Sequence, residues 1–132
     1  MIYILSGHIM KTYYYNCHHI VFATKYRMPL ITSEVLDQLK IHFQKKAIDL
    51  GIFIHIMNGY KDHVHLLISS PPRLSISIIA KNLKGYSSYR IAELRWQNGY
   101  SVFSVDAYSY DRVYHYIKNQ WAHHDARPYP RV

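Results

Sequence analysis

The chain has 132 residues, enough for one domain with a hydrophobic core but with little surface for gripping a large substrate. Its 16 lysines and arginines against 8 aspartates and glutamates give a formal charge of +8, which favours a polyanionic partner such as nucleic acid. The single cysteine, Cys17, excludes an internal disulfide and a thiolate metal cage, and no apolar run is long enough to cross a membrane.

No repeat, low-complexity tract or flexible linker divides the sequence, which favours one domain. We expect residues 1–12 to form an N-terminal extension, residues 13–124 the domain, and residues 125–132 a tail whose prolines cannot continue a helix. The first residues have neither the basic start nor the cleavage site of a secretory signal, so we expect a cytoplasmic protein.

The first half of the domain predicts a strand, a helix and a hairpin. Residues 13–24 are rich in aromatic and β-branched side chains and predict a strand, followed by a turn at 25–27. A helix should begin at about Ser33 and end before Gly51, because apolar residues recur there every three or four positions: Leu36, Leu39, Phe43, Ala47 and Leu50. Residues 52–58 predict a strand buried on both faces, which turns at 59–62 into a partner strand at 63–69.

The second half predicts a helix, a short strand and a last helix. Ser75 or Ser77 can cap a helix that runs toward about Arg95, with Ile79, Leu83 and Tyr86 facing inward. Residues 100–105 predict a strand, and a helix opened by Ser109 or Asp111 should continue through about His123.

This order of elements indicates an α+β fold on a ferredoxin-like or RRM-like plan. Its antiparallel sheet would carry two helices on one face, leaving the other face for a ligand or for the extra C-terminal helix. We expect the strand that contains His63 to be central.

His63 and His65 form a His-x-His pair on the strand predicted at 63–69. Side chains alternate along a strand, so these two should share one face while Val64, Leu66 and Ile68 occupy the other. Two imidazoles at this spacing can converge on one metal ion, but two ligands are too few and a pair of ordinary strand histidines explains the pattern as well.

Tyr116 and Gln120 lie four residues apart in the last predicted helix and should therefore share one helical face. Gln120 could supply a third metal ligand. In a chain with 14 tyrosines, a packed ring beside a solvated amide is the alternative interpretation.

Together these motifs resemble the single-tyrosine HUH transposases, and more narrowly the insertion-sequence 200/605 group. The resemblance is carried by HIVFATKYRMPLI, DHVHLLISSPP, LKGYSSYRI, WQNGYSVFSV and YIKNQ, which occur in that order and spacing between about Tyr13 and His124.

The resemblance implies an enzyme that cleaves and rejoins single-stranded DNA near end hairpins through a 5′-phosphotyrosine intermediate. Tyr116 would be the catalytic nucleophile, and His63, His65 and Gln120 would bind magnesium or manganese. It further implies a homodimer with composite active sites.

Basic residues on the first turn and the second helix are candidates for contacts to DNA, or merely solvated charges. They are Lys25, Arg27, Lys81, Lys84, Arg90 and Arg95. His18, His19, His123 and His124 could assist proton transfer, and the sequence selects none of them.

Three other functions are also compatible with the sequence. A domesticated relative would nick hairpin DNA for its host, and a non-catalytic module would bind single strands without needing a metal. A small metalloenzyme acting on another substrate would have no use for Tyr116.

Overall fold

A computed structural model describes residues 14–120, so the N-terminal extension, the C-terminal tail, His123 and His124 lie outside the described residues. The elements are β1 (Cys17–Ala23), the 3-10 turn η1 (Lys25–Arg27), α1 (Ser33–Leu50), β2 (Phe53–Tyr60), β3 (His63–Ser69), α2 (Ile76–Arg90), β4 (Ser101–Ser104) and α3 (Tyr110–Lys118). The strands pair antiparallel in the order β2-β3-β1-β4. The predicted α+β, ferredoxin-like plan is confirmed.

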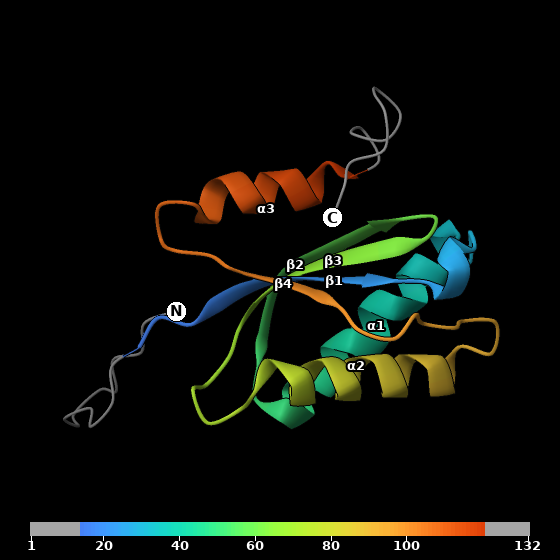
Figure 1. The fold of residues 1–132 in the computed structure, drawn as a ribbon, viewed down its shortest axis with the longest axis horizontal. Helices are drawn as coiled ribbons and strands as arrows, with labels where there is room; N and C mark the ends of the chain where they lie inside the picture. The colour runs from blue at the N-terminus through green and yellow to red at the C-terminus, as the bar shows by residue number, and fades with distance from the viewer. Residues whose placement is uncertain (1–13, 121–132) are drawn as a thin grey trace.

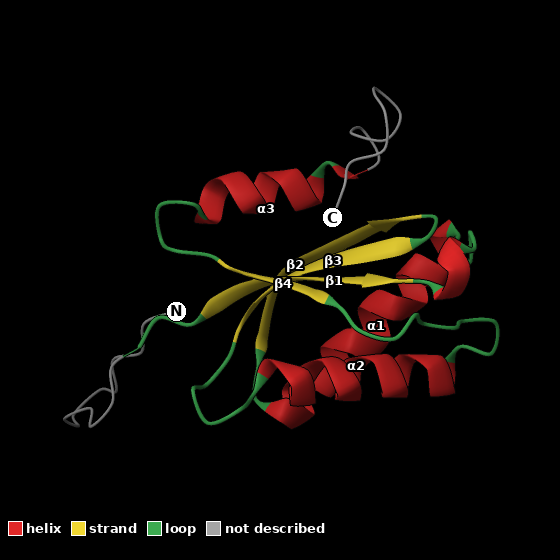
Figure 2. Ribbon diagram, in the orientation of Figure 1, coloured by secondary structure: helices red, strands yellow, loops and turns green. Residues whose placement is uncertain are grey.

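The molecule has three layers (Figure 1). Helices α1 and α2 cover one face of the sheet, and α3 lies across the other face (Figure 2). Strand β3 lies between β2 and β1, so the strand that contains His63 is central, as expected. No helix within residues 14–120 combines the length and apolar character needed to span a bilayer.

The alternation of side chains along the central strands builds a separate hydrophobic cluster on each face of the sheet. Val64, Leu66 and Ile68 face α1 and α2 and are fully buried, as predicted. Leu67 faces the other way and packs with Ile117 of α3 in a smaller cluster. The first cluster is the main core, and the second attaches α3 to the sheet.

The predicted caps of the first two helices are present. Gly51 ends α1 in the left-handed region with φ 75°, where a side chain would be strained. Ser75, rather than Ser77, caps α2 by accepting a hydrogen bond from the amide of Ile78. The end of α1 and the start of α2 are therefore encoded by the residues at those positions.

The prediction that α2 runs toward Arg95 is wrong, since the helix ends at Arg90 and Ile91 has extended backbone angles. Ile91 and Leu94 are buried in the main core, and reaching it takes the chain off the helix axis. Tyr86 is only half-buried, with its ring against His42 at the margin between α1 and α2.

The strand predicted at 52–58 is not buried on both faces. It is β2, which runs to Tyr60 and forms an edge of the sheet, with Phe53 48% exposed. Its register with β3 shifts between Ile54 and Ile56, a bulge that turns the intervening His55 toward α3.

The other boundary corrections are at the ends of strands and of α3. Strand β1 begins at Cys17 rather than Tyr13, and β4 spans Ser101–Ser104 rather than residues 100–105. Helix α3 ends at Lys118, because Asn119 leaves helical geometry, and the predicted end at about His123 lies outside the described residues.

Candidate active site

His63 and His65 both project from β3 toward α3, on the face opposite Val64, as the alternation predicts. Each is only 1% exposed, and their ring centroids lie 5.0 Å apart with the planes at 76°. Side chains that can each bind a cation are therefore buried together beneath the last helix.

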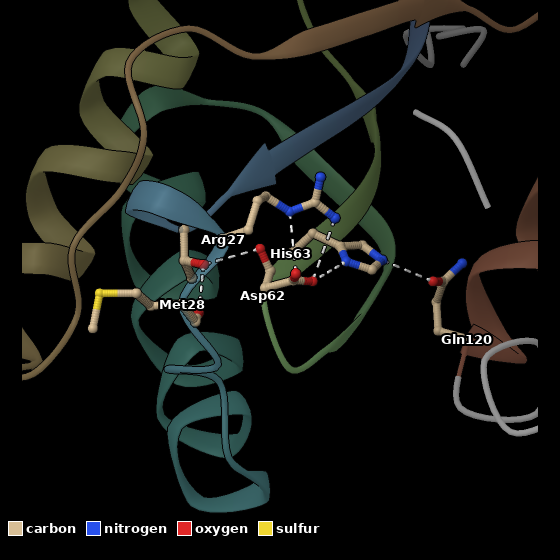
Figure 3. Close-up of polar contacts among 6 residues, drawn as sticks. Arg27, Met28, Asp62, His63 and Gln120 are labelled. Atoms are coloured by element: carbon tan, nitrogen blue, oxygen red, sulfur yellow. Dashed lines mark hydrogen bonds and ion pairs between the residues drawn. The ribbon is translucent and has the colours of Figure 1, made fainter. Parts of the chain in front are cut away.

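His63 is fixed by the residue before it. Its Nδ1 lies 2.9 Å from the Oδ1 of Asp62, and its Nε2 lies 3.4 Å from the Oε1 of Gln120 (Figure 3). A carboxylate at Nδ1 selects the tautomer whose Nε2 carries a lone pair, which is the form that binds metals. In that tautomer, Nε2 of His63 and Oε1 of Gln120 are two electron-pair donors 3.4 Å apart.

Asp62 is held in turn by the η1 turn. Nε of Arg27 donates to Oδ2 of Asp62 at 3.1 Å (Figure 3). The backbone amide of Thr24, just before that turn, donates to the Asp62 carbonyl at 2.9 Å. Tyr26 and Arg27 both have left-handed backbone angles, with φ of 56° and 53°. Such strain in residues other than glycine is typical of functional sites, and here it places Arg27 beside Asp62.

His65 has its own partner on the neighbouring strand. Its Nδ1 lies 2.7 Å from the Nε2 of His19 on β1, and the two rings stack with centroids 5.0 Å apart. Desolvation by burial lowers the pKa of His19 to about 4, so this ring is neutral near pH 7 and can accept the hydrogen on Nδ1 of His65. Of the histidines that the sequence left undistinguished, the structure brings His19 to the site.

Tyr116 reaches the same place from α3. Its ring centroid lies 5.8 Å from that of His65 and 6.4 Å from that of His19, in edge-on arrangements. Tyr116 is half-buried and packs against the smaller hydrophobic cluster. The phenol predicted as nucleophile therefore lies beside the two histidines within one chain.

Gln120 is fully buried beside His63, although it lies beyond the end of α3. Its Nε2 is 3.4 Å from the Tyr116 carbonyl, so the four-residue spacing still brings the pair together. Among residues 14–120, no three His, Cys, Asp or Glu side chains group as a metal site. The group that the structure does show beside the two imidazoles is the amide of Gln120, whose Oε1 lies 3.4 Å from Nε2 of His63.

The basic residues predicted to contact DNA are dispersed. Arg27 lies at the site, and exposed Lys81 lines a groove with Tyr100. Nζ of Lys84 donates to the carbonyls of Gln97 and Gly99, both at 2.7 Å, which gives it a structural role.

The remaining basic residues lie outside the histidine cluster. Lys25 lies over the Tyr26 ring, and Arg95 donates to the carbonyls of Ala92 and Leu94. Arg90 is exposed at the end of α2.

Sequence reasoning missed the parts played by Asp62 and His19. The adjacency of Asp62 to His63 was a usable signal, because a carboxylate beside a metal-binding histidine often orients it. The pairing of β1 with β3 that brings His19 to His65 joins residues 46 positions apart and had no local signal.

Comparison with known proteins decides the family. The profile of the family described as "Transposase IS200 like" matches residues 12–120. The chain belongs to the IS200-like transposase family. Family membership makes it a transposase, a DNA-binding protein of the kind that insertion sequences encode.

The sequences of individual relatives align with most of this chain. The ISDra2 transposase TnpA of Deinococcus radiodurans is 30% identical over 115 residues, covering 78% of this transposase and 82% of the relative. The transposase for insertion sequence element IS200 of Salmonella typhimurium is 32% identical over 120 residues, covering 80% and 78% respectively.

Solved structures share the fold. A crystal structure from Deinococcus radiodurans R1 has a TM-score of 0.68 and 27% identity, covering 90% of this chain and 98% of the other. A REP-associated tyrosine transposase bound to a REP hairpin has a TM-score of 0.69 at 15% identity, covering 89% and 74%. The latter likeness concerns the fold alone.

Proposed function

We propose that this transposase cleaves and rejoins single-stranded DNA with Tyr116 as the nucleophile. The observation that supports it is the convergence of Tyr116, His63, His65 and Gln120 on one face of the sheet. A phenol ionises more readily than a serine hydroxyl, so it is both a competent nucleophile and a competent leaving group. That balance suits a reaction that must run in both directions.

In the forward step, Oη of Tyr116 attacks the scissile phosphorus and the bond to the 3′-oxygen breaks. The phenol gives up its proton, the departing oxygen takes one up as a 3′-hydroxyl, and the DNA 5′-phosphate becomes joined to Tyr116. Attack of a 3′-hydroxyl on the phosphotyrosine reverses these changes and restores a phosphodiester. The energy of the bond is thus conserved for rejoining.

A divalent cation fits the residues present, and we propose that His63, His65 and Gln120 hold it. Two imidazoles and an amide oxygen are a chemically suitable donor set for manganese and acceptable for magnesium. When bound, such an ion supplies positive charge that polarises the phosphate and orients it. Asp62 and His19 keep the two imidazoles in the required tautomer, and burial under α3 excludes water from them.

We further propose hairpins in single-stranded DNA as the substrate. The support is the charge of +8, together with the structural neighbour that was solved with a REP hairpin. Either an insertion sequence or a host locus with repeated hairpins would provide such DNA, and the genes around this one distinguish the two. The homodimer with composite sites stays a prediction. In the single chain, α3 lies over its own sheet (Figure 1), and the Tyr116 ring lies 5.8 Å from that of His65.

The test is a covalent adduct. Wild-type protein incubated with manganese and single-stranded hairpin DNA from the flanks of its gene should form a species that survives denaturation, and chelator should prevent it. Tyr116→Phe lacks the attacking oxygen and should form none, whereas Tyr108→Phe, altered at a residue 98% exposed, should match wild type. An adduct in Tyr116→Phe would contradict the assignment of Tyr116 as the nucleophile. If wild-type protein bound the DNA without forming any adduct, the result would favour the non-catalytic module.

A further inference from the structure

Gln120 lies two residues beyond the last residue of α3, so helical geometry does not by itself place its side chain. Asn119, which precedes it, has a φ of −102° and a ψ of 28°, outside the helix. Gln120 is nevertheless fully buried, with Oε1 3.4 Å from Nε2 of His63 (Figure 3). The last carbonyls of a helix have no partner within it, so a side chain of another element can hold the chain there.

Asn58 of β2 makes such a contact. Its Nδ2 donates to the carbonyl of Lys118, the last residue of α3, at 3.0 Å. Its Oδ1 accepts from the backbone amide of Gly59 at 2.9 Å. Because the nitrogen of a side-chain amide only donates and the oxygen only accepts, the two contacts together fix which way the group faces. The end of α3 is thus tied to β2 by an oriented side chain.

The register of the sheet places Asn58 next to the histidines. Asn58 is the direct partner of His65 in the pairing of β2 with β3. Residues directly opposite in an antiparallel pair share a face, so Asn58 faces α3 as His65 does. At Gly59, a β-carbon would lie 2.7 Å from the carbonyl oxygen of His63 and 2.8 Å from Cγ1 of Val64, so this close approach of the strands needs glycine. The hairpin that presents the histidines therefore presents Asn58 as well.

The other end of α3 is attached to β2 by a different contact. Tyr110, the first residue of the helix, shares a hydrogen bond of 2.9 Å with His55. Tyr110 precedes Gln120 by ten positions, which corresponds to roughly 15 Å of helix. This contact can hold the start of α3 without determining where Gln120 lies, so it offers a matched control for the contact of Asn58.

We propose that Asn58 is a positioning residue for Gln120. By holding the carbonyl of Lys118, it directs the chain so that Oε1 of Gln120 lies beside His63 before any cation arrives. The inference rests on the proposed function, in which Gln120 is the third ligand of the cation. Groups that orient a ligand in this way contribute to metal affinity although they do not touch the metal.

The first test uses no cation. In NMR spectra of the wild type, the side-chain amide protons of Gln120 should show nuclear Overhauser contacts to the ring protons of His63. Asn58→Leu keeps a branched side chain but has no donor, and it should lose these contacts. Asn58→Gln keeps a donor and should recover part of them, whereas Tyr110→Phe, which removes a hydrogen bond at the far end of α3, should keep them. Unchanged contacts in Asn58→Leu would overturn the proposal.

The second test measures the dissociation constant for manganese by calorimetry. Asn58→Leu should raise it about tenfold, and Tyr110→Phe should leave it near the wild-type value. Gln120→Leu should also raise it, and adding Asn58→Leu to that variant should have little further effect, because the role of Asn58 passes through Gln120.

The outcomes separate the two proposals. Effects of Asn58→Leu and Gln120→Leu that simply multiply would mean that Asn58 does not act through Gln120. If the wild type bound no manganese while Asn58→Leu still removed the contacts between Gln120 and His63, the proposed cation site would be contradicted and the positioning role of Asn58 would be supported.

Discussion

At the scale of single residues, the site depends on the Nδ1 atoms of its histidines. Asp62 lies at that atom of His63 and His19 lies at that of His65, which leaves the Nε2 atoms for the cation that we propose. Partners of this kind fix ring orientation and tautomer, and their loss weakens metal binding by about tenfold to a hundredfold.

His19→Leu should therefore raise the dissociation constant for manganese by at least about tenfold, measured by calorimetry on protein without DNA. His65 would lose its acceptor and could adopt the wrong tautomer. His19→Gln keeps an acceptor oxygen and should recover part of the affinity. His18→Gln changes the neighbouring histidine, which alternation places on the opposite face of β1, and should have little effect. Unchanged affinity in His19→Leu would show that His65 needs no such support.

At the scale of elements, the position of Tyr116 depends on how α3 is attached to the sheet. Ile117 is fully buried against Leu67, and two hydrogen bonds to β2 lie near the helix ends. Tyr110 shares one of 2.9 Å with His55, and Nδ2 of Asn58 donates to the Lys118 carbonyl at 3.0 Å. The attachment is small, so α3 should be the least stably held helix.

Ile117→Ala should release α3 locally. Removing a buried isoleucine side chain costs about 2–5 kcal/mol, which is a large part of what so small an interface can supply. Amide hydrogens of residues 110–118 should exchange faster while those of α1 stay protected, and adduct formation should fall. Ile48→Ala, at a residue 71% exposed on α1, is the control. Equal protection of α3 in both variants would mean that other contacts hold the helix.

At the scale of the whole molecule, burial of neutral histidines makes the fold sensitive to acid. The pKa of His19 falls from 6.5 to about 4 on folding, and desolvation also lowers the pKa values of His18 and His55. A depressed histidine pKa means that the unfolded chain binds protons first. Its contribution to stability is complete above pH 6.5 and is lost as the pH falls toward 4.

The free energy of unfolding, measured with urea in the presence of chelator, should therefore decline between pH 6.5 and 4. His19 accounts for on the order of 3 kcal/mol of that decline if its pKa difference is fully expressed. In His19→Gln the decline should be shallower, since that position no longer titrates. Parallel pH curves for the two proteins would argue that His19 does not carry the effect.

Much of this transposase follows from local sequence. The three- and four-residue spacing of Leu36, Leu39 and Phe43 determines a buried helical face, and Gly51 determines where that helix ends. The alternation through His63, Val64 and His65 determines which side chains share a face of β3. Such patterns can be recognised in the sequence because they depend only on the repeat of side chains along a helix or strand and on the backbone geometry of neighbouring residues.

Other features were decided only by tertiary structure. Helix α2 ends early because Ile91 and Leu94 are drawn into the core, and β2 is half-exposed because it lies at an edge. His19 reaches His65 through strand pairing, and Lys84 bonds the carbonyls of Gln97 and Gly99, which lie beyond the end of its helix. Each depends on which distant segment becomes a neighbour. That choice is made by the packing free energy of the whole domain, which no local pattern records.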